Sequence, residues 1–196
     1  MPDPKSRSEE EYFLSREREL LRRLQAKARE EAERKNLAQA VGIENAQILE
    51  VLREMGFDRE TVVLLGLLPL IQVAWSDGAI SPEERAGLLE VSHTKGIEEG
   101  SAAHARLVTW LDRRPESTFF ERALTIIRDL MSYQTEDQRT ASSADLFAAC
   151  ERIASTSGGI LGLGAVSSAE REVLRRVAGE IEKAHRDAAE RVKDSL

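Results

Sequence analysis

One stretch of the sequence decides the fold: Ser76-Asp77-Gly78-Ala79-Ile80-Ser81-Pro82-Glu83-Glu84. An apolar segment precedes it, and its Asp-Gly pair is typical of a turn because glycine adopts positive φ without strain. A helix start follows, in which Ser81 is the N-cap, Pro82 takes the first helical position and Glu84 completes a capping box. The stretch therefore predicts two helices joined by a short turn.

The composition extends this prediction to the whole chain. Of the 196 residues 41% are hydrophobic, 32% are charged and only 5% are aromatic. The dominant residues are Ala, Leu, Glu and Arg, which are strong helix formers, and alternating β-type runs are almost absent. We therefore predict an all-α fold, a compact bundle of about seven to eight helices.

The chain divides into an N-terminal helical extension, residues 1–44, and a bundle, residues 45–196. The extension is dense in Glu, Arg, Ala and Leu from Glu9 to about Lys35, and opposite charges recur four residues apart. This pattern predicts a solvated helix. In the bundle, turn and cap signals predict helices over about 45–55, 58–75, 81–95, 101–112, 117–133, 135–155 and from 167 into a charged tail.

The extension also carries an incomplete hydrophobic repeat. Leucine or alanine recurs every seven residues at one of the two apolar positions of a heptad repeat. At the other apolar position, two of the three residues, Glu17 and Glu31, are acidic. This second position is too polar to predict a coiled coil. A second interpretation is a short apolar stripe that docks on another surface, formed by Phe13, Leu20, Leu24 and Ala28.

Charge and hydropathy exclude several classes of function. A net charge of −7 argues against nucleic-acid binding, which needs a basic patch. The most apolar stretch, residues 61–75, is short and contains Pro69 and Gln72, so we expect a buried helix and no integral membrane segment. The N-terminus lacks the apolar core of a signal peptide, which favours a cytoplasmic location.

Other chemistry is also poorly supported. The single cysteine, Cys150, lies in an apolar run, so we expect a buried small hydrophobe in a reducing compartment. The three histidines fall on different predicted helices, which argues against zinc. The glycine-rich stretch 158–164 lacks the Lys-Ser/Thr of a phosphate loop, and no spacing indicates a catalytic triad. We expect a protein that is not an enzyme.

The chain repeats the layout of its defining stretch once. Residues 153–158 and 166–174 again give a helix end, a Gly-containing loop, a β-branched residue, a Ser cap and a Glu at the third helical position, Glu170. The second loop is longer, and Ser157 or Leu163 stands where the first copy has Asp77. Two such copies predict a pseudo-repeated helix–loop–helix hairpin.

The Asp-Gly-x-Ile-Ser-x-x-Glu pattern after an Ala-rich helix resembles the tellurite-resistance TerB-like family, which includes the membrane-proximal domain of a DnaJ-like cochaperone. The resemblance covers about residues 57–184. It implies a compact helical bundle with two copies of the motif and a divalent cation, Ca²⁺ or Mg²⁺, bound by acidic residues. By position these would be Asp77, Glu84 and Glu170.

Two interpretations of these acids are open. Hard cations prefer several oxygen ligands, and the first loop also offers hydroxyls and backbone carbonyls. The loop is not an EF-hand, because Ala79 and Ser81 stand where further acidic ligands are needed. The other interpretation is structural: Asp77 belongs to an ordinary turn, and Glu84 and Glu170 each complete a capping box.

Two functions follow as hypotheses. The first is a non-enzymatic TerB-like module that acts in a stress or envelope-associated response, binds protein partners and holds one divalent cation at the Asp-Gly loop; peripheral envelope association and a homo-oligomer are both compatible with it. The second is a helical scaffold or oligomerisation protein without a ligand, which acts through its charged N-terminal helix.

Overall fold

The computed structural model describes residues 4–156 and 167–194, and in these ranges the fold is all-α. It contains no strand there, as the composition predicts. The helices are α1 (Pro4–Val41), α2 (Ala46–Glu54), a 3₁₀ helix η1 (Val62–Leu67), α3 (Leu68–Ala74), α4 (Pro82–Thr94), α5 (Ala102–Asp112), α6 (Ser117–Met131), α7 (Glu136–Thr156) and α8 (Ser168–Asp194).

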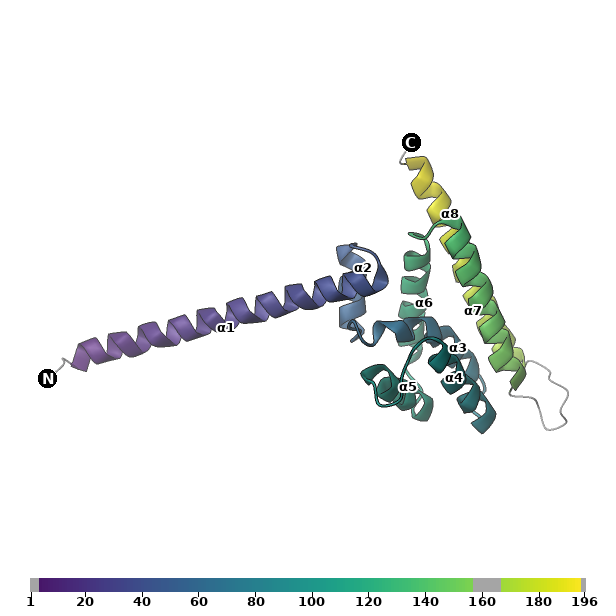
Figure 1. Ribbon diagram of the computed structural model, residues 1–196, viewed down its shortest axis with the longest axis horizontal. Coiled ribbons are helices and arrows are strands. Elements are labelled where there is room, and N and C mark those ends of the chain that lie inside the picture. Colours follow the sequence, from purple (N-terminus) through teal and green to yellow (C-terminus); the bar gives the residue numbers. More distant parts are fainter. Residues whose placement is uncertain (1–3, 157–166, 195–196) are drawn as a thin grey trace.

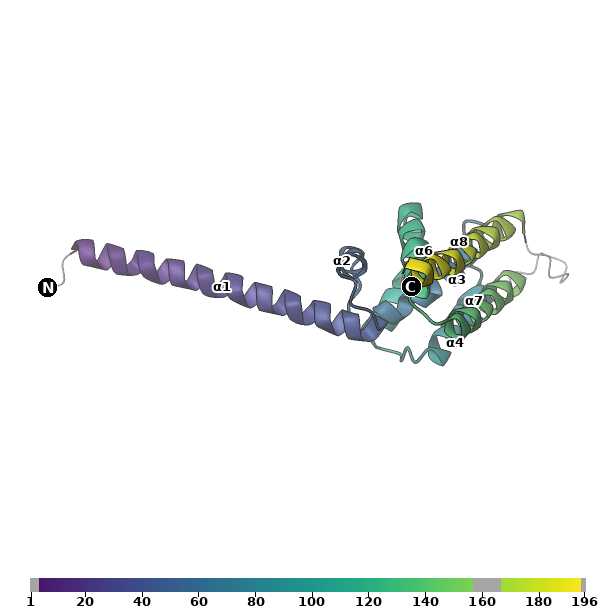
Figure 2. The same cartoon turned by 90° about the horizontal axis from the view of Figure 1, so that it is seen from above.

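Helix α1 projects from the bundle as a long arm (Figures 1 and 2). Its 38 residues span about 57 Å at 1.5 Å per residue. Every residue from Tyr12 to Asn36 is exposed, whereas Leu37 is 1% exposed and belongs to the main core. The helix is longer than the predicted Glu9–Lys35 segment because its last turns pack against η1 and α2.

The helix starts are set by local caps, mostly where the sequence predicts them. Asn45 caps α2, accepting hydrogen bonds from the backbone N–H groups of Gln47 and Ile48. Ser101 caps α5 in the same way. A reciprocal capping box between Thr135 and Gln138 starts α7, with distances of 3.1 and 3.3 Å. These bonds satisfy N–H groups that have no partner within the helix.

The apolar stretch before the first hairpin differs from its prediction. Asp58 caps it as expected, accepting from the backbone N–H of Thr61 at 2.8 Å, but one continuous helix does not follow. Residues Val62–Leu67 form the 3₁₀ helix and the α-helix begins only at Leu68. Pro69 explains the break, because it has no N–H to continue a helical ladder and is favoured in the first turn of a new helix.

Helix α3 lies at the centre of the bundle. All seven of its residues are buried, including Gln72, and it packs against α4, α6, α7 and α8. Helices α7 and α8 run antiparallel along one side (Figure 1). Cys150 on α7 is fully buried, as its apolar surroundings predict. Among the described residues, none of the helices combines the length and the hydropathy of a membrane span.

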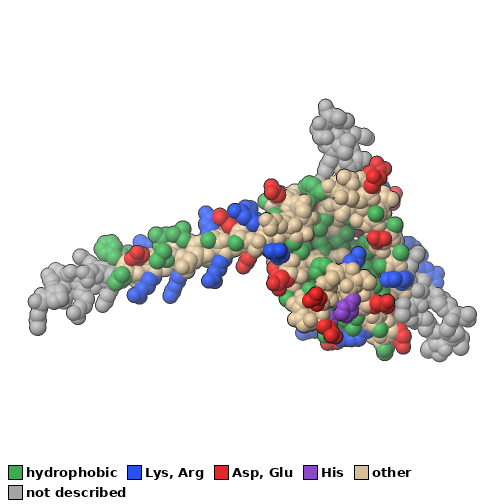
Figure 3. Space-filling view, viewed as in Figure 1, with side chains coloured by type: hydrophobic (Ala, Val, Ile, Leu, Met, Phe, Trp, Pro, Cys, Tyr) green, Lys and Arg blue, Asp and Glu red, His purple; other side chains and the backbone are tan. Residues whose placement is uncertain are grey.

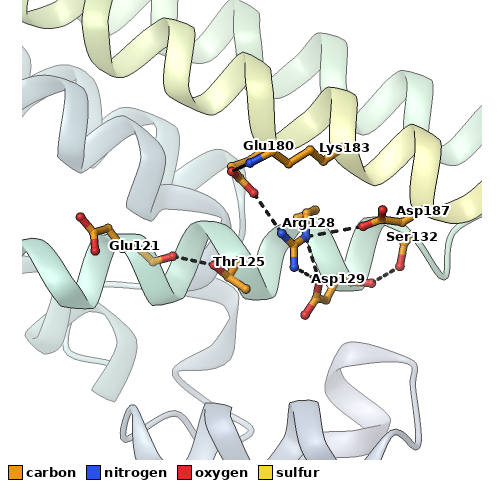
Figure 4. A network of polar contacts seen from close by, with 8 residues as sticks. All are labelled: Glu121, Thr125, Arg128, Asp129, Ser132, Glu180, Lys183 and Asp187. Carbon is orange, nitrogen blue, oxygen red and sulfur yellow. Dashed lines mark hydrogen bonds and ion pairs between the residues drawn. The ribbon is translucent and has the colours of Figure 1, made fainter.

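A network of charges joins α6 to α8. Arg128 lies 2.8 Å from a carboxylate oxygen of Asp129, 3.4 Å from Glu180 and 3.7 Å from Asp187, and Lys183 lies 2.5 Å from Glu180 (Figure 4). The hydrogen bonds that the Arg128 guanidinium donates to Asp129 raise its pKa above the ordinary value, against the opposing effect of burial. A network of this kind stabilises more than an isolated surface pair.

Arg106 ties the end of α2 to α5. Its guanidinium lies over the rings of Phe57 and Trp110, 4.7 and 4.9 Å from their centres. It also donates hydrogen bonds to the backbone carbonyls of Met55, at 2.8 Å, and Gly56. These carbonyls end α2, so Arg106 caps that helix from a distant part of the chain.

Candidate functional site

The two hairpins predicted from the repeat lie side by side. The first is α3 and α4 with the loop between them, and the second is α7 and α8; α7 packs against both α3 and α4 (Figure 2). The loop of the second hairpin, with Ser157 and Leu163, lies outside the described residues. The fold thus brings together two sequence segments that match each other.

Both hairpins carry a buried capping box. In the first, the Glu84 carboxylate accepts from the Ser81 N–H at 2.7 Å while the Ser81 hydroxyl accepts from the Glu84 N–H at 3.1 Å. In the second, Ser167 and Glu170 make the same pair of bonds at 2.5 and 3.1 Å. Glu84 is 3% exposed and Glu170 1%, so both acids have the structural role that the sequence allows.

A hydrogen bond connects the two hairpins. The Ser167 hydroxyl, which caps α8, donates to the Asp77 carboxylate at 3.0 Å. Asp77 lies two residues after the half-buried Trp75, whose indole N–H donates to the Trp110 carbonyl at 2.9 Å. Gly78, with φ of 92°, completes the turn. The turn acid of the first hairpin is therefore bonded to the cap of the second.

The three predicted acids lie near one another. Burial raises the pKa of the Glu84 carboxyl above its ordinary value, the hydrogen bonds from Ser81 lower it, and the negative charges of Glu170 and Asp77 raise it further. We call Asp77, Glu84 and Glu170 the acidic cluster. Glu84 and Glu170 are buried and Asp77 is exposed. Because the like charges repel, the cluster would be stabilised by a proton or by a cation.

The acidic cluster is not a preassembled metal site. Within the described ranges no three His, Cys, Asp or Glu side chains converge as a bound ion requires. Two of its carboxylates are engaged at helix caps, and the third accepts from Ser167. The Ser76 hydroxyl beside it is buried and has no hydrogen-bond partner among the described residues. To bind a cation, these side chains would have to leave their present hydrogen bonds and rotate toward the ion.

A second candidate is the apolar surface on α1. Six large hydrophobic side chains there are 49–69% exposed: Tyr12, Phe13, Leu14, Leu20, Leu21 and Leu24. The sequence predicted a stripe of Phe13, Leu20, Leu24 and Ala28. Leu14 and Leu21 widen this stripe, because a rotation of about 100° per residue places them on the same side of the helix as its other members.

A third candidate is an apolar groove across η1, α6 and α7. It consists of hollows of about 880 and 260 Å³ that meet at Gly66, Ile127, Met131 and Ser142. Its charged lining residues are Arg59, Lys95 and Asp145. The groove offers apolar contact area rather than a cluster of titratable side chains.

Sequence reasoning missed two of the residues that organise these sites. Ser167 was interpreted as a cap alone, but its hydroxyl also bonds Asp77. Arg106 was missed because the carbonyls that accept its hydrogen bonds lie about 50 positions away in the chain. Comparison of the chain with family models, curated proteins and solved structures gives no match.

Proposed function

We propose that this protein is a non-enzymatic interaction protein in which the bundle is a rigid base and α1 makes the contact with a partner. One observation supports this most strongly: α1 is exposed from Tyr12 to Asn36 and carries six large apolar side chains on that exposed length. Scattered exposed leucines are common, but contiguous ones mark interaction surfaces.

Membership of the TerB-like family, a cytoplasmic location and a role in a stress response belong to the same proposal. The pair of matching hairpins supports the family membership, since a Ser–Glu capping box starts α4 in the first and α8 in the second, and Asp77 and Ser167 join them. The stress role is what that family implies. A homo-oligomer is one form that contact through α1 can take.

A photo-crosslinking side chain tests where the contact is made. We expect the full-length Leu24→p-benzoylphenylalanine variant, irradiated in cells, to form crosslinked products with protein, lipid or a second copy. The control is the same replacement of Glu90, which is exposed on α4 of the bundle. Equal products, or none, from the two variants would rule out α1 as the contact element.

A second function, binding of one divalent cation, is supported by the acidic cluster. Three acids placed on two hairpins are neighbours, and the hydroxyl of Ser76, the residue before Asp77, is buried without a hydrogen-bond partner among the described residues. Ca²⁺ and Mg²⁺ bind carboxylate and hydroxyl oxygens. A cation would also relieve the repulsion from Glu170 and Asp77, which adds to the effect of burial in raising the pKa of Glu84.

Trp75 reports on this site because it lies two residues before Asp77. We expect its emission to change saturably as Ca²⁺, Mg²⁺ or Mn²⁺ is added, and Asp77→Asn to weaken the binding by roughly tenfold or more. Glu83→Gln, an exposed change on the same helical turn as Glu84, is the matched control and should leave the titration unchanged. A flat titration of the wild type with all three ions would refute cation binding.

A further inference from the structure

The apolar side chains of α1 form one continuous surface. At about 100° per residue, the five large apolar residues from Phe13 to Leu24, together with Ala28, fall within an arc of about 120°, and Tyr12 lies about 80° outside it. This arc, which we call the stripe, contains Phe13, Leu14, Leu20, Leu21, Leu24 and Ala28. All of these residues are exposed, and the ion pair that joins this arm to α2, between Glu30 and Arg53 at 3.1 Å, lies closer to the bundle than Ala28. The stripe is therefore a free face of an extended arm.

Positive charges border the stripe on both sides. The same geometry puts Arg16, Arg23 and Lys27 along one edge and Arg18, Arg22 and Arg29 along the other. Residues 12–29 hold these six cations and only two acids, in a chain whose net charge is −7. Figure 3 shows hydrophobic side chains along one side of this part of α1 and Lys and Arg along the other. The arm is thus locally basic and amphipathic.

This charge pattern distinguishes between two partners that could cover the stripe: a second copy of the helix and a lipid surface. When two copies of a helix pair through an apolar seam, the residues bordering the seam face each other and must be of opposite charge to attract. Here both borders are basic, so two stripes repel in either relative direction. An anionic lipid surface instead accepts the apolar arc at the acyl boundary and neutralises both borders at once.

We propose that the stripe lies on an anionic membrane surface, with α1 parallel to the bilayer and the bundle held at its margin. This inference rests on the proposed function, since it names the partner class that α1 contacts. Two acids oppose it: Glu19 pairs with Arg23 at 2.5 Å on one border, and Glu17 falls inside the arc, next to Phe13 and Leu20 on adjacent turns. Their negative charges weaken attachment and make binding dependent on the lipid charge rather than permanent.

Co-sedimentation of the full-length protein with vesicles tests the inference. We expect binding to phosphatidylcholine vesicles that contain phosphatidylglycerol, little binding to phosphatidylcholine alone, and loss of binding as salt rises. The triple variant Leu20→Ser, Leu21→Ser, Leu24→Ser should bind at least about tenfold less. Arg18→Gln with Arg22→Gln should also bind less, while Glu17→Gln should bind more tightly than the wild type.

Val63→Ser, which changes an exposed apolar side chain on η1, is the control and should bind like the wild type. Absence of wild-type binding to the phosphatidylglycerol vesicles overturns the inference. So does a vesicle-free dimer that the triple variant abolishes, or crosslinking at Leu24 to protein alone. Those last two outcomes would leave the proposed function standing, whereas absence of any crosslink at Leu24 would remove both.

Discussion

Leu37→Ala is expected to lower the free energy of unfolding by about 3 kcal/mol, as is typical for a leucine truncated in a packed core. Leu37 is 1% exposed and is the buried residue through which α1 joins the main hydrophobic cluster. Its loss leaves a cavity at the base of the arm. Urea unfolding followed by the emission of Trp75 and Trp110, which lie in the bundle, measures the effect.

Leu24→Ala is the matched control, because it makes the same chemical change on the same helix. Leu24 is 55% exposed, so this variant should unfold within about 0.5 kcal/mol of the wild type. Equal losses in the two variants would mean that α1 is not anchored at Leu37. Comparing the two variants therefore distinguishes Leu37, which anchors α1 to the bundle, from Leu24, which is exposed on α1.

Arg106→Ala is expected to destabilise the protein by about 2–3 kcal/mol, the sum of lost charge-assisted hydrogen bonds and cation–π contact. The carbonyls of Met55 and Gly56 would lose their donor, and Phe57 and Trp110 would lose the group that lies over both rings. Thermal unfolding by circular dichroism measures the loss. Arg106→Lys should recover only part of it, because an ammonium group cannot serve two carbonyls and two rings at once.

Arg114→Ala provides the comparison for Arg106, since Arg114 is exposed in the link between α5 and α6. We expect it to change stability by less than about 0.5 kcal/mol. If Arg106→Ala were equally mild, the guanidinium would not hold α2 against α5.

The parts of the fold that depend on near neighbours could be predicted from the sequence. The capping boxes at Ser81, Thr135 and Ser167 each involve two residues three positions apart, so spacing alone identifies them. The burial of Cys150 follows from the apolar residues around it. The two-hairpin repeat is visible for the same reason, because each copy carries its own cap.

Features that depend on distant neighbours could not be predicted. The bond from Ser167 to Asp77 spans 90 positions and exists only because α7 and α8 pack beside the first hairpin. Trp110, four residues after Arg106, is a local signal for one ring contact, but nothing near Arg106 in the sequence indicates the second ring, Phe57. The 3₁₀ helix over Val62–Leu67 was missed because an apolar run has no periodicity that separates the two helix types. Its break at Pro69 was the one local signal available.

Leu24 and Leu37 lie on one continuous helix, so the direction in which the stripe faces relative to the bundle is fixed. One residue inserted between them would rotate the stripe by about 100° about the helix axis and move it outward by about 1.5 Å. Four residues would restore the angle to within about 40° while lengthening the arm by about 6 Å. Rotation and reach are therefore set together by the number of residues in that segment, and not by their identity.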